Sequence, residues 1–408
     1  MRVKHSSSIL VTRCDGATKF SITDKREILS QTVPGILFIV NSLHFGGAEK
    51  HVISLLNHMS TDHFRFSLAY LKCDETLLIQ LDKARLQDIF CCDVAKKIDW
   101  RAVRLLALKI DKNEVDLVVC VNTYSMLYGL LARWFTRRTF KLVDILHTTL
   151  LCTVKAKLQM IIYRPVFRQC DLLVYVCENQ RTYWRRKGLR PKADKVIYNG
   201  IDPSHYSDKY SLDEKQELRE QLGFGRDDYV IGICAVLRPE KAHSDLLDAI
   251  KRLHAKGLAA KCLIIGDGPE RPNVERKIVE LGLSGHVAIT GFQQDVRPFI
   301  AACDVMSLVS HSETFSITAL EAMALGKPMI LSKVGGAEEQ VKAGANGYVF
   351  LPGDIDMLAD YLARLADVDI RAELSQGARI RVVTDFSLSA MVQAYESAMD
   401  SLLTHDEA

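Results

Sequence analysis

Two glutamates eight residues apart, Glu313 and Glu321, flank the start of a predicted helix, and their spacing suits a ligand with both hydroxyl and phosphate groups. The apolar run Val305–Val309 is typical of a buried parallel strand, and residues 316–325 are typical of a helix that ends at Gly326. Glu313 would then lie at the carboxyl end of the strand, where open α/β sheets bind ligands. The helix start favours a phosphate between the two carboxylates. A nucleotide-sugar carries both kinds of group.

Further short motifs follow one another along the chain, and each alone also has an ordinary structural explanation. Gly46 and Gly47 open a predicted helix six residues after the first strand. They either let the backbone approach an anionic ligand or form a plain strand-to-helix turn. His147 ends another predicted strand, where it either faces a ligand or fills a structural role. Arg238 and Lys241 follow the first strand of the second half, and they are either ligands of a diphosphate or solvated charges.

The ordered set of motifs resembles the retaining glycosyltransferases of the GT-B fold, and family 4 in particular. The resemblance covers roughly residues 35–400 and implies an α/β chain with two Rossmann-like domains that face an inter-domain cleft. Its motifs are Gly46-Gly47-Ala48-Glu49, His147, Asn199-Gly200-Ile201-Asp202, Arg238-Pro239-Glu240-Lys241, Gly266-Asp267-Gly268-Pro269, the Glu313-to-Glu321 pair and Gly335-Gly336-Ala337-Glu338-Glu339.

The resemblance also implies roles for individual residues. Two of them are catalytic: His147 would contact the donor sugar near its reacting centre, and Glu313 would hold the sugar hydroxyls. Glu321 would hold the ribose. The other implied donor-binding residues are Gly46, Gly47, Arg238, Lys241, Phe315 and Ser316. No metal and no cofactor is implied, because the cations and the helix start would neutralise the leaving diphosphate.

Two positions depart from the family pattern. Val236 stands where many members carry arginine, so Arg238 would take over that role, and Ser316 stands where many carry glycine. The acidic pair Glu338 and Glu339 either closes a loop near the cleft together with the preceding glycines or is a charge pattern at a helix start.

The chain of 408 residues has the composition of a soluble globular protein, with 48% hydrophobic and 25% charged residues. Short apolar strands alternate with helical patterns, which predicts parallel sheets covered on both faces. We expect a flexible extension at 1–32, an acceptor domain at 33–200, a nucleotide-sugar domain at 201–385, and a terminal helix within 386–408 that returns to the first domain. The predicted strands are Ile36–Val40, Phe66–Tyr70, Ile89–Cys92, Leu117–Val121, Leu142–Ile145, Leu172–Val176, Val230–Val236, Cys262–Ile265, Val287–Ile289, Val305–Val309, Met329–Leu331 and Tyr348–Phe350.

The eleven cysteines are scattered apart from Cys91-Cys92, and no C-x-x-C pair occurs. Such a set predicts reduced thiols in a cytosol rather than a disulfide framework. No apolar run approaches the roughly 20 residues that span a bilayer, and the polar N-terminus lacks the pattern of a secretory signal. We therefore expect a cytoplasmic protein.

Charge is unevenly divided along the chain. Residues 1–200 contain 32 Lys and Arg against 18 Asp and Glu, whereas residues 201–408 contain 21 against 32. Aromatic and basic residues alternate in the first half, which favours an anionic membrane surface but also fits core-facing helices with solvated basic faces. No nucleic-acid motif accompanies them. The stretches are Lys155–Arg168, Arg181–Arg190 and Arg133–Lys141, the last with Trp134, Phe135, Arg137, Arg138 and Phe140.

The resemblance therefore implies a retaining, metal-independent glycosyltransferase of the hexosyltransferase type. Its acceptor would be a lipid-linked saccharide at the inner face of the cytoplasmic membrane, in polysaccharide or glycolipid biosynthesis. Three alternatives stay open: a GT-B sugar-nucleotide epimerase, a catalytically silent subunit that binds nucleotide-sugar, and a transferase with a small soluble acceptor. The donor sugar, the base, the linkage and the oligomeric state are not predicted.

Overall fold

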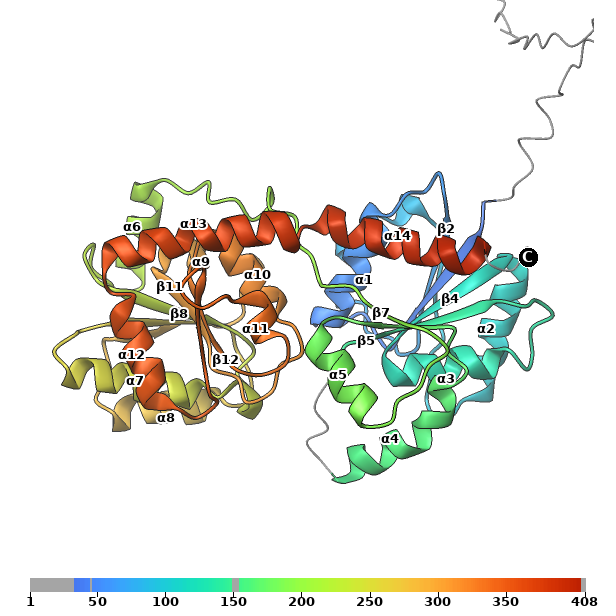
Figure 1. Cartoon of the computed structure of the whole chain (residues 1–408), viewed down its shortest axis with the longest axis horizontal. Helices are drawn as coiled ribbons and strands as arrows, with labels where there is room; N and C mark the ends of the chain where they lie inside the picture. The colour runs from blue at the N-terminus through green and yellow to red at the C-terminus, as the bar shows by residue number, and fades with distance from the viewer. Residues whose placement is uncertain (1–32, 45, 149–153, 405–408) are drawn as a thin grey trace, which may run out of the picture.

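The computed structural model describes residues 33–44, 46–148 and 154–404, without the side chains of 154–159 and 162. The predicted extension 1–32 lies outside the described residues. Two α/β domains lie side by side along the long axis of the molecule, each built on one twisted sheet with helices on both faces (Figure 1). The α/β fold class with two Rossmann-like domains is confirmed.

The N-terminal domain has a seven-stranded sheet in the order β3-β2-β1-β4-β5-β6-β7, and every neighbouring pair is parallel. Its apolar strands are buried on both faces, which is why they form near-continuous hydrophobic runs. The strands are β1 (Gly35–Val40), β2 (Arg65–Tyr70), β3 (Leu86–Cys91), β4 (Val115–Val121), β5 (Lys141–Leu146), β6 (Leu172–Tyr175) and β7 (Asp194–Val196). The helices are α1 (Gly47–His58), α2 (Trp100–Lys112), α3 (Asn122–Ala132), α4 (Val154–Phe167) and α5 (Glu178–Arg186), with short 3-10 turns η1 (Thr76–Gln80) and η2 (Lys83–Arg85).

The C-terminal domain has a six-stranded parallel sheet in the order β10-β9-β8-β11-β12-β13. Its strands are β8 (Val230–Cys234), β9 (Lys261–Ile265), β10 (Val287–Ile289), β11 (Val305–Leu308), β12 (Met329–Ser332) and β13 (Gly347–Phe350). Its helices are α6 (Leu212–Gln221), α7 (His243–Ala255), α8 (Arg271–Glu280), α9 (Arg297–Ala302), α10 (Ile317–Ala324), α11 (Ala337–Gln340), α12 (Ile355–Arg364) and α13 (Val368–Asp385), with the 3-10 turn η3 (Pro239–Lys241).

The chain crosses between the domains twice, and the two crossings lie side by side. Ile201 donates its N–H to Phe386 O at 3.0 Å, and Leu388 donates to Ile201 O at 2.7 Å. Helix α14 (Leu388–Thr404) then continues from α13 across the N-terminal domain (Figure 1). The hydroxyl of Ser387 accepts from Ala390 N, as the predicted N-cap requires.

All twelve predicted strands are present, with ends that differ by a few residues. Strand β7 was not predicted, because Asp194–Val196 is only three residues long and largely polar. It pairs with β6 at the sheet edge, where one neighbouring strand is enough to hold it.

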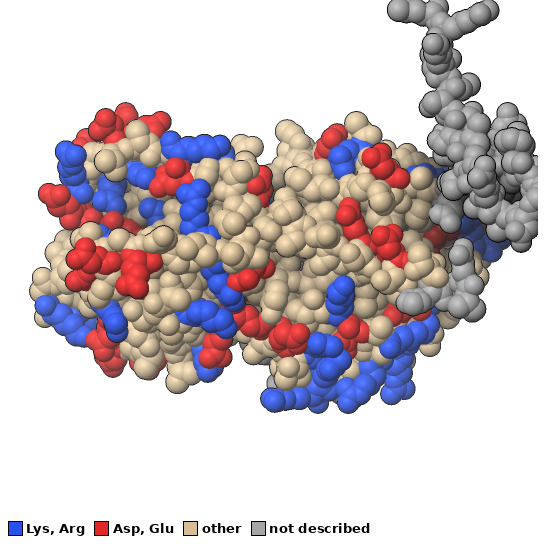
Figure 2. All heavy atoms as spheres, turned by 45° about the horizontal axis from the view of Figure 1, so that its top comes forward, with Lys and Arg blue, Asp and Glu red and all other residues tan. Residues whose placement is uncertain are grey.

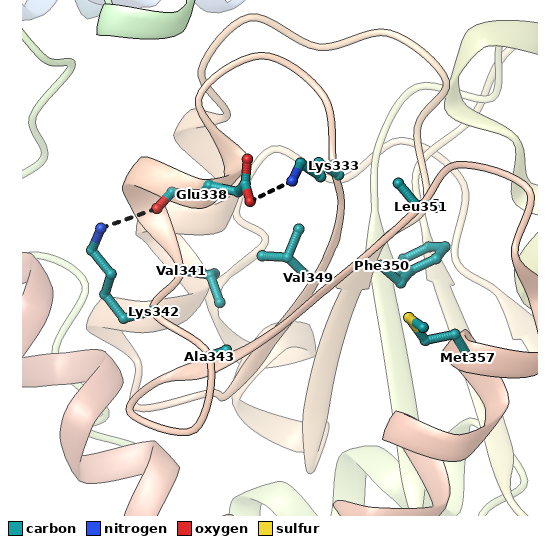
Figure 3. Close-up of a pocket in the computed structure, with 9 residues that line it drawn as sticks. All are labelled: Lys333, Glu338, Val341, Lys342, Ala343, Val349, Phe350, Leu351 and Met357. Atoms are coloured by element: carbon teal, nitrogen blue, oxygen red, sulfur yellow. Dashed lines mark hydrogen bonds and ion pairs between the residues drawn. The ribbon is translucent and has the colours of Figure 1, made fainter.

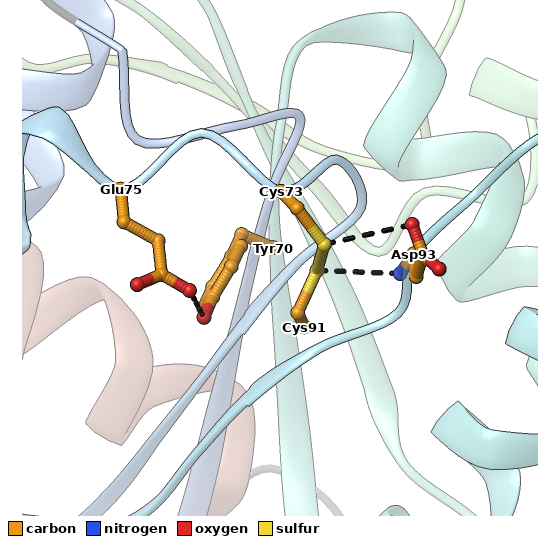
Figure 4. The surroundings of a disulfide bond; sticks show 5 residues. All are labelled: Tyr70, Cys73, Glu75, Cys91 and Asp93. Carbon is orange, nitrogen blue, oxygen red and sulfur yellow. Dashed lines mark hydrogen bonds between the residues drawn. A yellow bond between two sulfur atoms is a disulfide. The ribbon is translucent and has the colours of Figure 1, made fainter.

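The prediction that the cysteines are reduced thiols is wrong at one place. Cys73 and Cys91 form a disulfide that joins the loop after β2 to the end of β3 (Figure 4). Their spacing of 18 residues follows no disulfide motif, and only the parallel pairing of β2 with β3 brings them together. The seven other described cysteines are free and buried, as expected for small core residues. The cysteine pattern therefore no longer supports a reducing compartment.

Candidate active site

The two sheets have their topological switch points between β1 and β4 and between β8 and β11, where the strand order reverses. Ligands of open α/β sheets bind beyond the carboxyl ends of strands at such points. Gly46 and Gly47 follow β1, Lys241 follows β8, and Glu313 follows β11. The predicted residues therefore gather at the two switch points.

The N-termini of α1 and α10 meet across the domain boundary. A Cβ on Gly47 would lie 3.8 Å from Ile317 Cδ1, so the first turns of the two helices are in contact distance. Gly46 is the N-cap of α1, and a Cβ there would meet the Glu49 carboxylate, which would have to move aside. Two helix starts that face one boundary provide free N–H groups and positive dipole ends for an anion.

Helix α10 is anchored through its cap. Ser316 accepts from Ala319 N through its hydroxyl at 3.2 Å and donates its own N–H to Gln340 Oε1 at 3.3 Å. Glu321 is buried one turn further along, where Tyr206 donates its hydroxyl to Oε1 at 2.7 Å. Lys50 of α1 places Nζ 4.0 Å from the same oxygen. Glu321 therefore receives contacts from both domains.

The predicted cations differ in their surroundings. Lys241 Nζ forms a short ion pair with Glu313 Oε2, and both side chains are about a quarter exposed. Arg238 is exposed, and among the described residues its guanidinium makes no hydrogen bond or ion pair. The structure thus brings Lys241 and Glu313 together and leaves Arg238 exposed.

His147 is held by its backbone from both domains. Its N–H donates to Asn122 Oδ1 at 2.9 Å, and its carbonyl accepts from the Thr314 hydroxyl at 2.8 Å. Asn122 adopts the left-handed conformation with φ 69°, which turns its side chain back toward the end of β5. Burial lowers the pKa of the His147 imidazole to about 4, so the ring is neutral at physiological pH.

Several buried polar atoms near the carboxyl ends of the strands have no hydrogen-bond partner within the described part of the chain. They belong to Asn41 after β1, His147 after β5, Ser310 after β11, and His243 at the start of α7. Buried polar groups in proteins are normally paired. A polar ligand between the two switch points would supply partners for such atoms.

Phe315 packs inside the protein rather than facing a ligand with its ring. The ring centroid lies 5.4 Å from that of Tyr198 and 5.5 Å from that of Phe386. Gly335 and Gly336 pack so closely on the loop 313–315 that a Cβ on either would clash with it. These glycines therefore hold the loop 313–315 against the start of α11, and a donor contact of Phe315 would have to use its backbone.

The two glutamates after these glycines have different partners. Glu339 accepts from Glu178 N at 2.8 Å and from Asn179 N at 2.9 Å, so it caps the start of α5 in the other domain. Glu338 instead pairs with Lys333 of its own domain at 2.7 Å. Both glutamates lie in the first turn of α11, as the charge pattern at a helix start predicts, and Glu339 in addition contacts the other domain.

Four residues at the site were missed from the sequence: Lys50, His51, Asn122 and Tyr206. Lys50 and His51 directly follow the Gly46-Gly47-Ala48-Glu49 motif, and their place in the first turns of a helix at the switch point could have indicated them. Asn122 follows β4 directly, which is a similar signal. Tyr206 carries no local signal, since only the tertiary structure brings it to Glu321.

A hollow of about 490 Å³ lies elsewhere, between β13, α11 and α12 (Figure 3). Its walls are Val341, Val349, Leu351 and Met357, with the Lys333–Glu338 pair at the rim. None of the predicted site residues lines it, so we do not assign it to the chemistry at the switch points. Within the described ranges there is also no group of three metal-ligating side chains and no helix long and apolar enough to cross a membrane.

Two family models match different parts of the chain. The model of glycosyltransferase family 4 matches residues 45–205, and that of glycosyl transferases group 1 matches residues 214–381. Two parallel α/β sheets in one chain are the architecture of the GT-B fold, and solved GT-B glycosyltransferase structures match this chain. The chain belongs to the family 4-like glycosyltransferases of the GT-B fold.

Relatives and solved structures extend this result. The chain is 28% identical over 221 residues to N-acetyl-alpha-D-glucosaminyl L-malate synthase of Bacillus anthracis, covering 54% of this chain and 57% of that protein. It is 24% identical over 323 residues to the capsular polysaccharide biosynthesis glycosyltransferase CapM of Staphylococcus aureus, covering 77% of this chain and 84% of CapM. The crystal structure of Anabaena HepE in complex with UDP-glucose has a TM-score of 0.79 and 26% identity, over 90% of this chain and 99% of HepE.

Proposed function

We propose that this protein is a retaining glycosyltransferase that moves a sugar from a nucleotide-diphosphate sugar to an acceptor. The observation that carries the proposal is the meeting of the α1 and α10 helix starts beside the Lys241–Glu313 pair, with Glu321 one turn further along. This arrangement combines an anion site with carboxylates that accept hydroxyl hydrogen bonds. The HepE structure holds UDP-glucose, a ligand with the same groups.

In the proposed complex the diphosphate lies at the two helix starts with Lys241 and Arg238. Glu321 accepts from the ribose hydroxyls, Glu313 accepts from hydroxyls of the transferred sugar, and His147 lies beside the reacting carbon. Negative charge that develops on the leaving diphosphate is stabilised by fixed dipoles and cations, which need no reorganisation during the reaction. The reaction then requires no metal from the protein.

Thermal unfolding with a panel of nucleotide-sugars tests the donor. A ligand that binds only the folded protein raises its stability by about 2.7 kcal/mol at 100 times its Kd. We expect UDP-glucose or another nucleotide-diphosphate sugar to raise the unfolding temperature, and the matching free sugar to have no effect. A flat response to every nucleotide-sugar contradicts the proposal.

The chemistry has two further tests once a donor is found. The anomeric configuration of the product, read by NMR, should match that of the donor sugar. Transfer should persist in EDTA, and loss of transfer with rescue by a divalent cation contradicts the metal-independent mechanism. Release of a sugar epimer without any acceptor would instead indicate an epimerase.

We also propose that the acceptor is a lipid-linked saccharide and that the protein works peripherally at the cytoplasmic face of a membrane. The support is the basic N-terminal half, whose Lys and Arg side chains gather along one edge of that domain (Figure 2). The name of CapM places that relative in polysaccharide biosynthesis. Surface cations near an anionic bilayer each contribute about 1 kcal/mol at most, and salt screens them.

One aromatic residue that the sequence placed on this surface, Phe140, is buried instead. Phe140 is only 7% exposed and lies under the Arg133 guanidinium, so it is a core residue and is not free to insert. Arg133 pairs with Asp171, and Arg138 pairs with Asp116. Local spacing could not show these distant acidic partners.

Four apolar side chains just after α3 and on α2 are exposed, and two of them are in contact. Trp134 is 71% and Phe135 42% exposed, and Trp100 and Leu108 of α2 are 46% and 66% exposed. The rings of Trp100 and Phe135 are 6.1 Å apart, and Arg104 lies over Phe135. Aromatic rings beside cations suit the interface of an anionic bilayer.

Vesicle co-sedimentation tests this surface. Binding should need anionic lipid, fall as salt rises, and weaken strongly in Trp100→Ser/Trp134→Ser. Val279→Ser is the matched control, because Val279 is 69% exposed on α8 of the other domain. If the wild-type protein ignores anionic vesicles at low salt, a soluble acceptor becomes the better proposal.

A further inference from the structure

A second histidine lies against the candidate catalytic histidine. His51, in the second turn of α1, is 3% exposed, and its ring is 5.0 Å from the His147 ring in an edge-to-face arrangement with an interplanar angle of 70°. Aromatic pairs in this geometry restrict each other's rotation and are favourable beyond their buried area. His51 therefore limits the orientations that the His147 ring can adopt.

His51 is itself fixed by the last helix of the chain. Its Nε2 is hydrogen-bonded to the Tyr395 hydroxyl of α14 at 3.1 Å, and the two rings are 5.4 Å apart at 66°. Burial raises the pKa of Tyr395, so its hydroxyl keeps its proton. The result is a buried chain of three rings, Tyr395, His51 and His147, that runs from α14 to the end of β5.

Both histidines are neutral in this arrangement. Burial and the neighbouring His147 lower the pKa of His51 well below its ordinary value, and burial lowers that of His147. Two neutral imidazoles can pack edge to face, whereas two imidazolium ions would repel each other. His147 Nε2 has no hydrogen-bond partner among the described residues. The ring chain therefore orients His147 while its buried Nε2 keeps its capacity for a hydrogen bond.

We propose that His51 and Tyr395 are positioning residues for His147, so that helix α14 forms part of the active site through this chain of rings. The inference rests on the proposed role of His147 at the reacting carbon. It extends that role by making the orientation of His147 depend on a helix that enters from the C-terminal domain. Neither residue touches the substrate in this proposal.

Matched variants separate positioning from simple docking of the helix. Tyr395→Phe removes the hydrogen bond and keeps the ring. His51→Leu removes the ring pair, whereas His51→Gln keeps a hydrogen-bonding atom near the place of Nε2. Glu396→Ala is the control, because Glu396 also ties α14 to the N-terminal domain, through Ser60 N at 2.6 Å, but is not part of the ring chain.

The first measurement needs no substrate. The imidazole ¹⁵N resonances of His147 are assigned in histidine-labelled full-length protein by their loss in His147→Gln. We expect Tyr395→Phe and His51→Leu to shift these resonances and Glu396→Ala to leave them in place. Equal shifts in Tyr395→Phe and Glu396→Ala, or no shift in either, would overturn the proposal.

The second measurement uses the nucleotide-sugar that stabilises the protein. Since small misplacements of a reacting group can cost about a hundredfold, we expect turnover to fall tenfold or more in Tyr395→Phe and His51→Leu, with partial recovery in His51→Gln and little change in KM. A parallel loss of donor affinity would overturn the positioning role. If no nucleotide-sugar binds, the proposed function fails while the resonance shifts still decide this inference.

Discussion

Glu339 should hold the two domains together, whereas its neighbour Glu338 should not. The Glu339 carboxylate accepts from the N–H groups of Glu178 and Asn179 at 2.8 and 2.9 Å, at the positive end of α5. The Glu338 carboxylate pairs with the half-exposed Lys333 at 2.7 Å, within its own domain. Two adjacent glutamates thus provide one inter-domain contact and one internal control.

The size of the effect follows from these contacts. A hydrogen bond to a charged group contributes about 1.5–3 kcal/mol when buried, and an anion at a helix start adds about 0.3–1 kcal/mol. Because Glu339 is only half-buried, solvent weakens both contributions, and we expect Glu339→Ala to destabilise the protein by about 2 kcal/mol. The exposed pair of Glu338 should contribute about 0.5 kcal/mol or less.

Small-angle X-ray scattering and urea unfolding check this expectation. Glu339→Ala should destabilise the protein by about 2 kcal/mol and shift the balance of closed and open domains by about thirtyfold, since 1.4 kcal/mol corresponds to a factor of ten. The radius of gyration should increase without ligand and return toward the wild-type value with bound nucleotide. If Glu338→Ala and Glu339→Ala behave alike in both assays, the contact does not hold the domains together.

Four further outcomes are expected. Glu321→Ala should weaken binding of a nucleoside by about 1.5–3 kcal/mol in calorimetry. Glu313→Gln should lower turnover and leave nucleotide binding unchanged. Wild-type transfer activity in both variants would contradict the assigned roles. Lys241→Met should weaken binding of a nucleoside diphosphate far more than that of the nucleoside, and equal losses would indicate a role in stability. Ala242→Gly should stabilise the fold by about 0.5–1 kcal/mol in urea unfolding, because Ala242 has φ 50°. Because the folded pKa of His147 is about 4 and the unfolded value about 6.5, the unfolded chain binds more protons as pH falls below 6.5. Lowering the pH to 5.5 should therefore reduce the free energy of unfolding by about 1.4 kcal/mol through His147 alone. The His147→Gln variant should lose about that much less than the wild type.

Residues whose role depends on local pattern could be predicted from the sequence. The Glu313–Glu321 spacing placed one carboxylate in a loop after a strand and the other inside a helix, and α10 begins at Ile317 as this required. Gly47 begins α1 at the carboxyl end of β1 for the same reason. Strand and helix periods are local properties, and parallel strands bring their carboxyl ends to one edge.

Residues whose role depends on a distant partner could not be predicted in this way. Phe140 stands in a basic, aromatic stretch that suggested exposure, yet it is buried in the core. Its neighbour Arg133 finds Asp171, 38 residues away. Cys73 and Cys91 meet only because β2 and β3 are neighbours.

By itself, the sequence determined the two parallel sheets and the set of polar and charged residues at their carboxyl ends, because hydrophobic periodicity and helix-start chemistry act over a few residues. Only the tertiary structure decided which of those residues meet. Glu339 caps a helix 160 residues away, and Tyr395 reaches His51 across 344 residues. Such contacts depend on how the two sheets and the returning helix pack together, and no short window of the chain contains both partners.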